Sequence, residues 1–209
     1  QRTIAAAKQS LSHPQPVTHV GTGKAKVAQF ASNRRILGTD GKVKIVRFSS
    51  SRNPAAIAAP EGIIDPDVRV LSLWNEDKPL VALSYYATHP QSYYGKGGVS
   101  CDTVGLARAM HEQQTPETLH IHFNGAGGNI GAGKYNNGDP KNRPLLAQRL
   151  ADGMKQAWES TKKSPLTAND VNWKVKPVLL PLRDTLDEAA LTGILQNPRA
   201  KLTDRIRAA

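Results

Sequence analysis

His89, which precedes a proline, is the leading candidate for a chemical role in this sequence. His89-Pro90 follows residues 80–87, an apolar run that predicts a buried strand. Because proline restricts the backbone of the residue before it, the His89 imidazole is expected at a strand end with little freedom. Such a histidine could be a metal ligand, although a structural histidine held by a local hydrogen bond is the simpler interpretation of these residues alone.

Asp102 precedes residues 103–114, whose apolar spacing predicts a helix. Its carboxylate could cap that helix through the free N–H groups of the first turn. It could instead face the site and orient a ligand histidine, as carboxylates around metal ligands do. The adjacent Cys101 is expected to be a small buried residue, because nothing near it in the sequence supplies a basic partner. It is the only cysteine, so no intrachain disulfide can form.

A pair of histidines lies in the short strand expected over residues 118–123. Alternation along a strand places His120 and His122 on one face. The pair could bind a metal if a third ligand converges on it, or it could lie on a solvated sheet face.

The glycine-rich segment GAGGNIGAG, residues 125–133, follows that strand. It lacks the Lys-Ser/Thr ending of a phosphate-binding loop and misses the GxGxxG spacing, so a nucleotide site is not favoured. Its N–H groups could instead stabilise an oxyanion. Lys134 and Tyr135 come next and could bind substrate, although Asn137-Gly138 is also typical of a simple turn.

The predicted elements mix helices and strands, which indicates an α/β or α+β fold. Helices are expected over residues 2–10, 103–114, 142–161, 186–195 and 201–207. Strands are expected over residues 17–30, 42–48, 68–74, 80–87, 118–123 and 171–182.

The composition is that of a globular chain of 209 residues, with 39% hydrophobic and 22% charged residues. No apolar stretch approaches the roughly 20 residues that span a membrane. The formal net charge is +11. The lysines and arginines are scattered, so nucleic-acid binding is not favoured, whereas contact with a membrane surface stays open.

Taken in order, several segments resemble the motifs of one family, the neutral/alkaline non-lysosomal ceramidases. The resemblance covers residues 1–160. The matching segments are residues 33–35 (NR), 53–54 with 65–71 (NP … DP-x-V-x-VL), 87–92 (A-x-HP-x-S/T), 100–105 (S-x-D-x-x-G) and 123–132 (the glycine-rich loop).

This resemblance implies two packed β-sheets flanked by helices, a four-layer αββα-like domain of which this chain holds an incomplete part. Residues 1–163 would belong to the catalytic domain, and residues 164–209 would continue it. The activity implied is zinc-dependent cleavage of the N-acyl bond of ceramide, in a secreted or periplasmic protein. His89 matches a zinc ligand, and the other histidine, the glutamate and the tyrosine of the family's site would lie outside this chain. The isolated chain is therefore expected to be inactive.

Two positions depart from the family's pattern. Gly131 stands where ceramidases carry the serine thought to attack the amide, and Asn129 stands at the acidic position of that loop, whereas Asp102 matches the motif aspartate. Because zinc lowers the pKa of bound water towards neutrality, hydrolysis of an amide or ester needs no serine. The sequence thus predicts a zinc-dependent hydrolase of a lipid-like or other small substrate, in which His89, Asp102 and the loop converge. The alternatives are a binding module that lost its nucleophile and a basic binder of nucleic acid or membrane surfaces.

Overall fold

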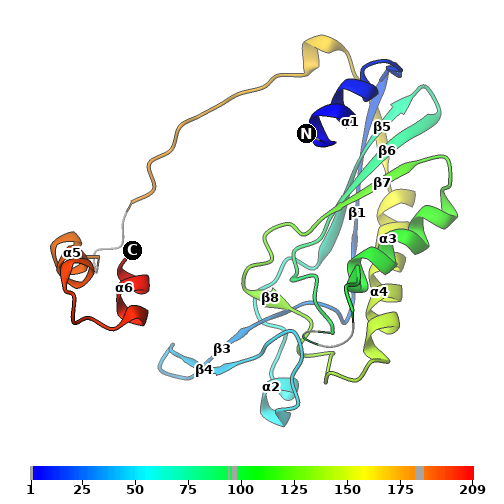
Figure 1. The fold of residues 1–209 in the computed structure, drawn as a ribbon. Helices are drawn as coiled ribbons and strands as arrows, with labels where there is room; N and C mark the ends of the chain where they lie inside the picture. The colour runs from blue at the N-terminus through cyan, green and yellow to red at the C-terminus, as the bar shows by residue number, and fades with distance from the viewer. Residues whose placement is uncertain (1, 94, 96–97, 182–185) are drawn as a thin grey trace. The chain divides into compact units, whose positions relative to one another are not determined.

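The computed structural model describes residues 2–93, 95, 98–181 and 186–209 (Figure 1). The chain divides into two compact units, Gln1–Val171 and Asn172–Ala209. Among the described residues, no helix combines the length and the apolar character needed to cross a membrane.

The first unit is built on a five-stranded sheet with the strand order β7-β6-β5-β1-β9. Neighbouring strands are antiparallel, except that β6 and β7 run parallel. The strands are β1 (His19–Lys26), β5 (Asp67–Asn75), β6 (Lys78–Tyr85), β7 (Leu119–Phe123) and β9 (Lys162–Pro165).

Two short antiparallel ladders accompany this sheet in the described residues. One joins β2 (Ser32–Asn33) to β8 (Ile130–Gly131), and the other joins β3 (Arg35–Leu37) to β4 (Val43–Val46). The remaining elements are the helices α1 (Arg2–Ser10), α2 (Pro54–Ala58), α3 (Asp102–Gln114) and α4 (Asn142–Glu159) and a 3-10 turn (Ala168–Asp170). Sheets flanked by helices confirm the predicted α/β class.

Helices α3 and α4 pack on one face of the large sheet (Figure 1). Leu146, Leu150 and Met154 of α4 are buried against Val68 and Val70 of β5. These positions recur every three or four residues on the helix and every two on the strand, as two packed apolar faces require. The core of the first unit therefore lies between these helices and the sheet.

Helix α4 lies close against β1 and against Val27, the residue that follows it, with a glycine on each side of the contact. A Cβ on Gly23 would lie 2.0 Å from the carbonyl oxygen of Ala157, and one on Gly153 would lie 2.6 Å from Val27 Cγ2. These glycines therefore set the separation of helix and sheet.

The buried histidine of α3 lacks a hydrogen-bond partner in the described part of the chain. The His111 side chain is 2% exposed, and both of its ring nitrogens are unpaired within the described residues. Its ring centroid lies 4.6 Å from that of His120 and 6.1 Å from that of Trp158. Burial, aided by His120 and opposed by Glu159, lowers the pKa of His111 to about 4. His111 is therefore neutral in the folded protein.

Acidification from pH 7 to pH 5 is expected to lower the free energy of unfolding by about 2 kcal/mol through His111 alone. A histidine in the unfolded chain has a pKa near 6.5. The unfolded state therefore takes up a proton as the pH falls below 6.5, whereas the folded state binds one only near pH 4. The contribution of His111 to the free energy of unfolding is thus fully present above pH 6.5 and is lost as the pH falls. Urea denaturation of wild type and His111→Phe at both pH values measures the effect, because phenylalanine keeps the ring and cannot titrate.

Burial also lowers the pKa of His122 to about 4. The free energy of unfolding of His111→Phe is therefore expected to fall on acidification too, but by less than that of wild type. The exposed His13 provides the control, since His13→Phe is expected to keep the full pH dependence. An equal fall in stability for wild type and His111→Phe contradicts the prediction.

Two expectations from the sequence are wrong. The strand expected over residues 171–182 is absent over 171–181, where the chain runs outside any ladder and exposes Trp173 to 89%; residue 182 lies outside the described residues. Pro177 interrupts this run and lacks the N–H that a ladder needs. Cys101 is exposed rather than buried, because it lies ahead of the first turn of α3.

The second unit contains helices α5 (Glu188–Gln196) and α6 (Leu202–Ala208), which pack on one another. Both helices match the sequence expectation. Asp187 caps α5, accepting a hydrogen bond from the N–H of Ala190 at 3.1 Å.

Candidate active site at the ends of two parallel strands

The candidate site forms where β6 and β7 end. Because these strands are parallel, their carboxyl ends meet at one edge of the sheet, the usual place for a site in such folds. His89 follows β6 and residues 125–133 follow β7. The N–H of Thr88 donates to the carbonyl of Asn124 at 3.3 Å, and that of His89 donates to the carbonyl of Ile130 at 3.0 Å. The two segments are thus joined directly.

The orientation of His89 leaves one ring nitrogen free to act as a ligand. Its Nδ1 lies 2.8 Å from the carbonyl oxygen of Gly127. Since a carbonyl only accepts, Nδ1 carries a proton, so in the neutral ring Nε2 is the nitrogen with the lone pair, as in metal-binding histidines. A Cβ on Gly127 would lie 2.6 Å from the carbonyl carbon of Thr88, so only glycine allows this contact.

Zinc sites in proteins use three or four protein ligands. Within the described residues, no three His, Cys, Asp or Glu side chains come together as a possible metal site. His120 and His122 share the helix-facing side of β7, as expected, without a third partner of this kind in that part of the chain. The chain as described therefore supplies one zinc ligand of the kind expected, His89, and not a complete set.

Asp102 ties the segment after His89 to the start of α3. Its carboxylate accepts hydrogen bonds from the N–H groups of Ser92 (3.0 Å), Tyr93 (3.3 Å) and Thr103 (2.6 Å), and from the hydroxyl of Ser92. Burial acts to raise the pKa of Asp102, but these hydrogen bonds outweigh it and lower the pKa below its ordinary value. The carboxylate is therefore ionised at neutral pH.

Asp102 does not contact His89, whose ring is oriented by Gly127 instead. Its backbone φ of 47° lies in the left-handed region that non-glycine residues seldom adopt. Such strain collects at functional sites. The Nε of Arg143 lies 4.0 Å from the carboxylate, and its guanidinium stacks over the ring of Tyr93 at 4.3 Å.

The amide of Asn136 links three segments of the site and was missed in the sequence. Its Nδ2 donates to the carbonyls of Ser49 (2.9 Å) and Ser92 (2.7 Å), and its Oδ1 accepts from the N–H of Gly138 and the side chain of Asn142. Asn136 is fully buried, and its amide group donates two hydrogen bonds and accepts two, so no buried polar atom of this side chain is left without a partner. In the sequence this asparagine resembles part of an ordinary Asn-Asn-Gly turn.

The two positions that depart from the ceramidase pattern lie in the loop beside Asn33. The Nδ2 of Asn129 donates to the side-chain oxygen of Asn33 at 2.7 Å. Gly131 is buried in β8, where its carbonyl accepts from the hydroxyl of Ser32 at 3.0 Å. A Cβ on Gly131 would lie 3.6 Å from the Cα and Oγ of Ser49, an ordinary contact distance. The site therefore has room for a Cβ atom at Gly131.

The predicted substrate-binding residues hold a neighbouring loop. The Nζ of Lys134 donates to the carbonyls of Ile57 (2.8 Å) and Ala59 (2.5 Å) at the end of α2. The hydroxyl of Tyr135 donates to a carboxylate oxygen of Glu61 at 2.5 Å, and burial, with this bond, raises the pKa of Tyr135 to about 12. Both side chains are thus engaged in positioning residues 57–61.

Arg47 also holds the loop over residues 56–61, a role that the sequence did not indicate. Its side chain is 1% exposed. Its two terminal nitrogens donate to five main-chain carbonyls at 2.8–3.2 Å, those of Asn33, Ala56, Ala59, Pro60 and Glu61. Nothing local distinguishes it from the surface arginines, because its acceptors are set by the fold.

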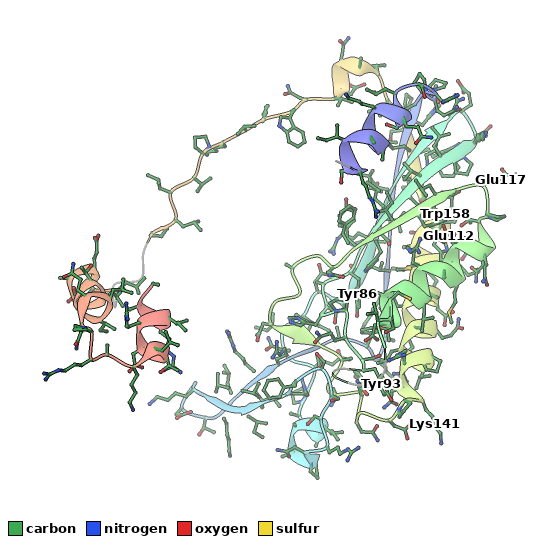
Figure 2. The ribbon with its side chains drawn as sticks, in the orientation of Figure 1. Tyr86, Tyr93, Glu112, Glu117, Lys141 and Trp158 are labelled. Atoms are coloured by element: carbon green, nitrogen blue, oxygen red, sulfur yellow. The ribbon has the colours of Figure 1, made fainter. Side chains whose placement is uncertain are left out.

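Two clefts border these segments. One, of about 300 Å³, is lined by Ser50, Ser51, Arg52, Ser92, Tyr93, Asn137 and Gly138. The other, of about 240 Å³, is more apolar and is lined by Ile63, Ile64, Asp65, Arg69, Tyr85, Tyr86, Ala87, Gly125, Ala126 and Ile130. Figure 2 shows Tyr86 and Tyr93 at the end of the sheet where β6 and β7 finish. His89 and the loop are in direct contact, and Asp102 joins them through Ser92, but neither cleft is lined by His89 or Asp102.

Comparison with known proteins bears on the fold. No protein-family model matches the sequence, and no curated protein matches it. Among solved structures, the neutral ceramidase from Pseudomonas aeruginosa is similar over 75% of this chain, with 20% sequence identity and a TM-score of 0.53. A ceramidase complexed with C2 is similar over 73%, with 19% identity and a TM-score of 0.52. The fold is ceramidase-like.

The similarity covers only part of these larger proteins. This chain spans 25% of the length of the Pseudomonas aeruginosa ceramidase and 24% of the other. At this level of identity the likeness concerns the fold alone. The ceramidase-like fold agrees with the resemblance read from the sequence motifs.

Proposed function

We propose that this chain is part of a zinc-dependent hydrolase that cleaves an amide or ester bond, with His89 as one of its zinc ligands. The supporting observation is the hydrogen bond from Nδ1 of His89 to the carbonyl of Gly127, which makes Nε2 the ring nitrogen available to a metal, close to where two parallel strands end. Zinc bound there would lower the pKa of a coordinated water and polarise the carbonyl to be cleaved. The other ligands would come from residues outside this chain.

The glycine-rich loop supports the same proposal. Within the part of the chain that the structure describes, the N–H groups of Gly128 and Asn129 have no hydrogen-bond acceptor. Free N–H groups next to a ligand histidine can stabilise the negative charge that develops on a carbonyl oxygen during hydrolysis. Asp102 is proposed as a positioning residue, because its carboxylate fixes the segment that follows His89.

The more apolar of the two clefts favours a substrate with a hydrocarbon part. It is bordered by Gly125 and Ala126 of the loop and by Ile63, Ile64 and Ile130. A lipid-like amide is therefore the proposed substrate class, in a secreted or periplasmic protein working near a membrane surface. A binding module without chemistry is the second candidate, and Gly131 at the serine position is the observation that favours it.

Zinc content tests the proposal. The full-length protein that carries this chain is expected to hold about one zinc per chain, measured by elemental analysis after exhaustive dialysis. His89→Ala is expected to lose most of it, since one ligand of three or four is removed. His13→Ala is the matched control, because His13 is exposed and its Nδ1 forms a hydrogen bond with the hydroxyl of its neighbour Ser12. Equal zinc in wild type and His89→Ala, or none in either, contradicts the proposal and favours the binding module.

A further inference from the structure

Helix α3 is held against the rest of the first unit by a short and partly polar face. Its buried residues are Thr103, Ala107 and His111, which recur every four positions on one side of the helix. Val104 and Met110 are only partly buried. Helix α4 instead buries a long face without polar side chains, made of Leu146, Ala147, Leu150, Ala151, Gly153, Met154 and Ala157. Of the two helices, α3 is therefore the more weakly held.

Both polar residues of the α3 face lack hydrogen-bond partners within the described residues. Thr103 is 0% exposed and its Oγ1 is unpaired, and His111 is unpaired at both ring nitrogens. A buried polar atom without a partner carries a desolvation penalty that contact with water relieves. Since the described residues already enclose both side chains, segments beyond this chain have no access to these atoms. The penalty thus belongs to the closed position of α3 itself.

The surroundings of His111 offer no acceptor for a proton on its ring. The titratable groups around it belong to the two elements packed against α3 and to α3 itself. They are His120 and His122 of β7, Glu159 and Lys155 of α4, and Arg108 and Glu112 of α3. Each of the two acids is paired with the base on its own helix. A proton on His111 would therefore create a buried cation without an acceptor, so the state that binds the proton is one in which the imidazole meets water.

The opposite end of α3 holds the segment that follows His89. Asp102 is the first residue of α3, and its carboxylate accepts hydrogen bonds from the N–H groups of Ser92 (3.0 Å) and Tyr93 (3.3 Å). His111 lies about 14 Å further along the helix, at a rise of 1.5 Å per residue. Figure 2 shows Tyr93 towards the start of α3, with Glu112 and Trp158 near its other end. The helix thus connects the buried histidine to the segment after His89.

We propose that α3 opens on acidification: His111 takes up a proton, α3 separates from β7 and α4 as a unit, and Asp102 releases the segment after His89. Local opening of this kind involves the elements with the fewest buried apolar contacts. The segment after His89 would then be fixed at neutral pH and released in acid. Neither zinc nor hydrolysis takes part in the opening, so it is independent of the proposed function.

Hydrogen exchange of the full-length protein, followed by mass spectrometry at pH 7 and pH 5 and corrected for intrinsic exchange rates, tests this opening. The pKa of His111 is about 4 in the closed state and near 6.5 in water, which makes opening about 20-fold more favourable at pH 5. The amides of α3 are therefore expected to lose protection by about this factor relative to those of α4. The amides of Ser92 and Tyr93 are expected to follow α3, because their acceptor leaves with it.

Two variants on the same face of α3 separate the proton from the packing. His111→Phe keeps a ring in the core and cannot titrate, so it is expected to lose most of this pH dependence. Thr103→Val removes the unpaired hydroxyl, so it is expected to increase the protection of α3 at both pH values and to leave their ratio unchanged.

Three results overturn the proposal. The first is an equal loss of protection in α3 and α4 of the wild type, which means global unfolding and can be seen even if His111→Phe does not fold. The second is a pH dependence in His111→Phe as large as that of wild type. The third is full protection of the Ser92 and Tyr93 amides at pH 5 while α3 exchanges.

Discussion

Replacing Arg47 with methionine is expected to lower the free energy of unfolding of the Gln1–Val171 unit by about 4 kcal/mol. The guanidinium is buried, and its hydrogen-bond partners are five main-chain carbonyls. Replacing both residues of a buried ion pair with apolar residues can leave the free energy of unfolding unchanged, because neither charge is left without its partner. Here the carbonyls cannot be replaced, so all five would lose their donor, and that of the buried Ala56 would stay buried without one.

Urea denaturation followed by circular dichroism measures this loss. Arg35→Met is the control, since Arg35 is exposed on β3 and the same exchange there is expected to change stability by less than about 0.5 kcal/mol. Arg47→Lys is expected to fall between wild type and Arg47→Met, because an ammonium has three donors and cannot span the same carbonyls. If Arg47→Met is as stable as Arg35→Met, Arg47 does not hold the loop over residues 56–61.

Serine at Gly133 is expected to destabilise the first unit by at least about 3 kcal/mol, whereas serine at Gly131 is expected to cost less than about 1 kcal/mol. A Cβ on Gly133 would lie 1.9 Å from the carbonyl oxygen of Phe48, so the backbone would have to move. A Cβ on Gly131 would lie 3.6 Å from its nearest neighbour, Ser49. The two variants carry the same substitution in the same loop, two residues apart.

Thermal and urea denaturation of the two variants side by side measures this difference. The comparison bears on function, because a tolerated serine at Gly131 means that the fold itself does not exclude a side chain there. The packing around Gly131 would then not explain why this chain has glycine at that position. Equal destabilisation by both variants contradicts this interpretation of the loop.

Much of the secondary structure followed from local patterns. Helix 142–161 and strands 68–74 and 80–87 were predicted within a few residues, because each buries one face and its apolar spacing records that burial. The expected strand over residues 171–182 failed because a strand needs a partner, and a run of strand-forming residues does not show whether one is present. The exposure of Cys101 does not follow from the sequence for a similar reason, since its burial depends on what lies beside the start of α3.

The sequence by itself determined that His89 ends a buried strand and that a glycine-rich loop follows another. Only the tertiary structure decided that these strands lie side by side and parallel, which brings His89 and Gly127, 38 positions apart, into hydrogen-bond contact. It also decided that Arg47 and Asn136 are buried and donate hydrogen bonds to main-chain carbonyls. The sequence had instead drawn attention to Lys134 and Tyr135 as candidates for substrate binding. The physical reason is that apolar spacing and turn residues report on a residue's own neighbours in the chain. A polar side chain acquires its role from carbonyls brought to it by distant segments, such as Ser49 lying 87 positions from Asn136.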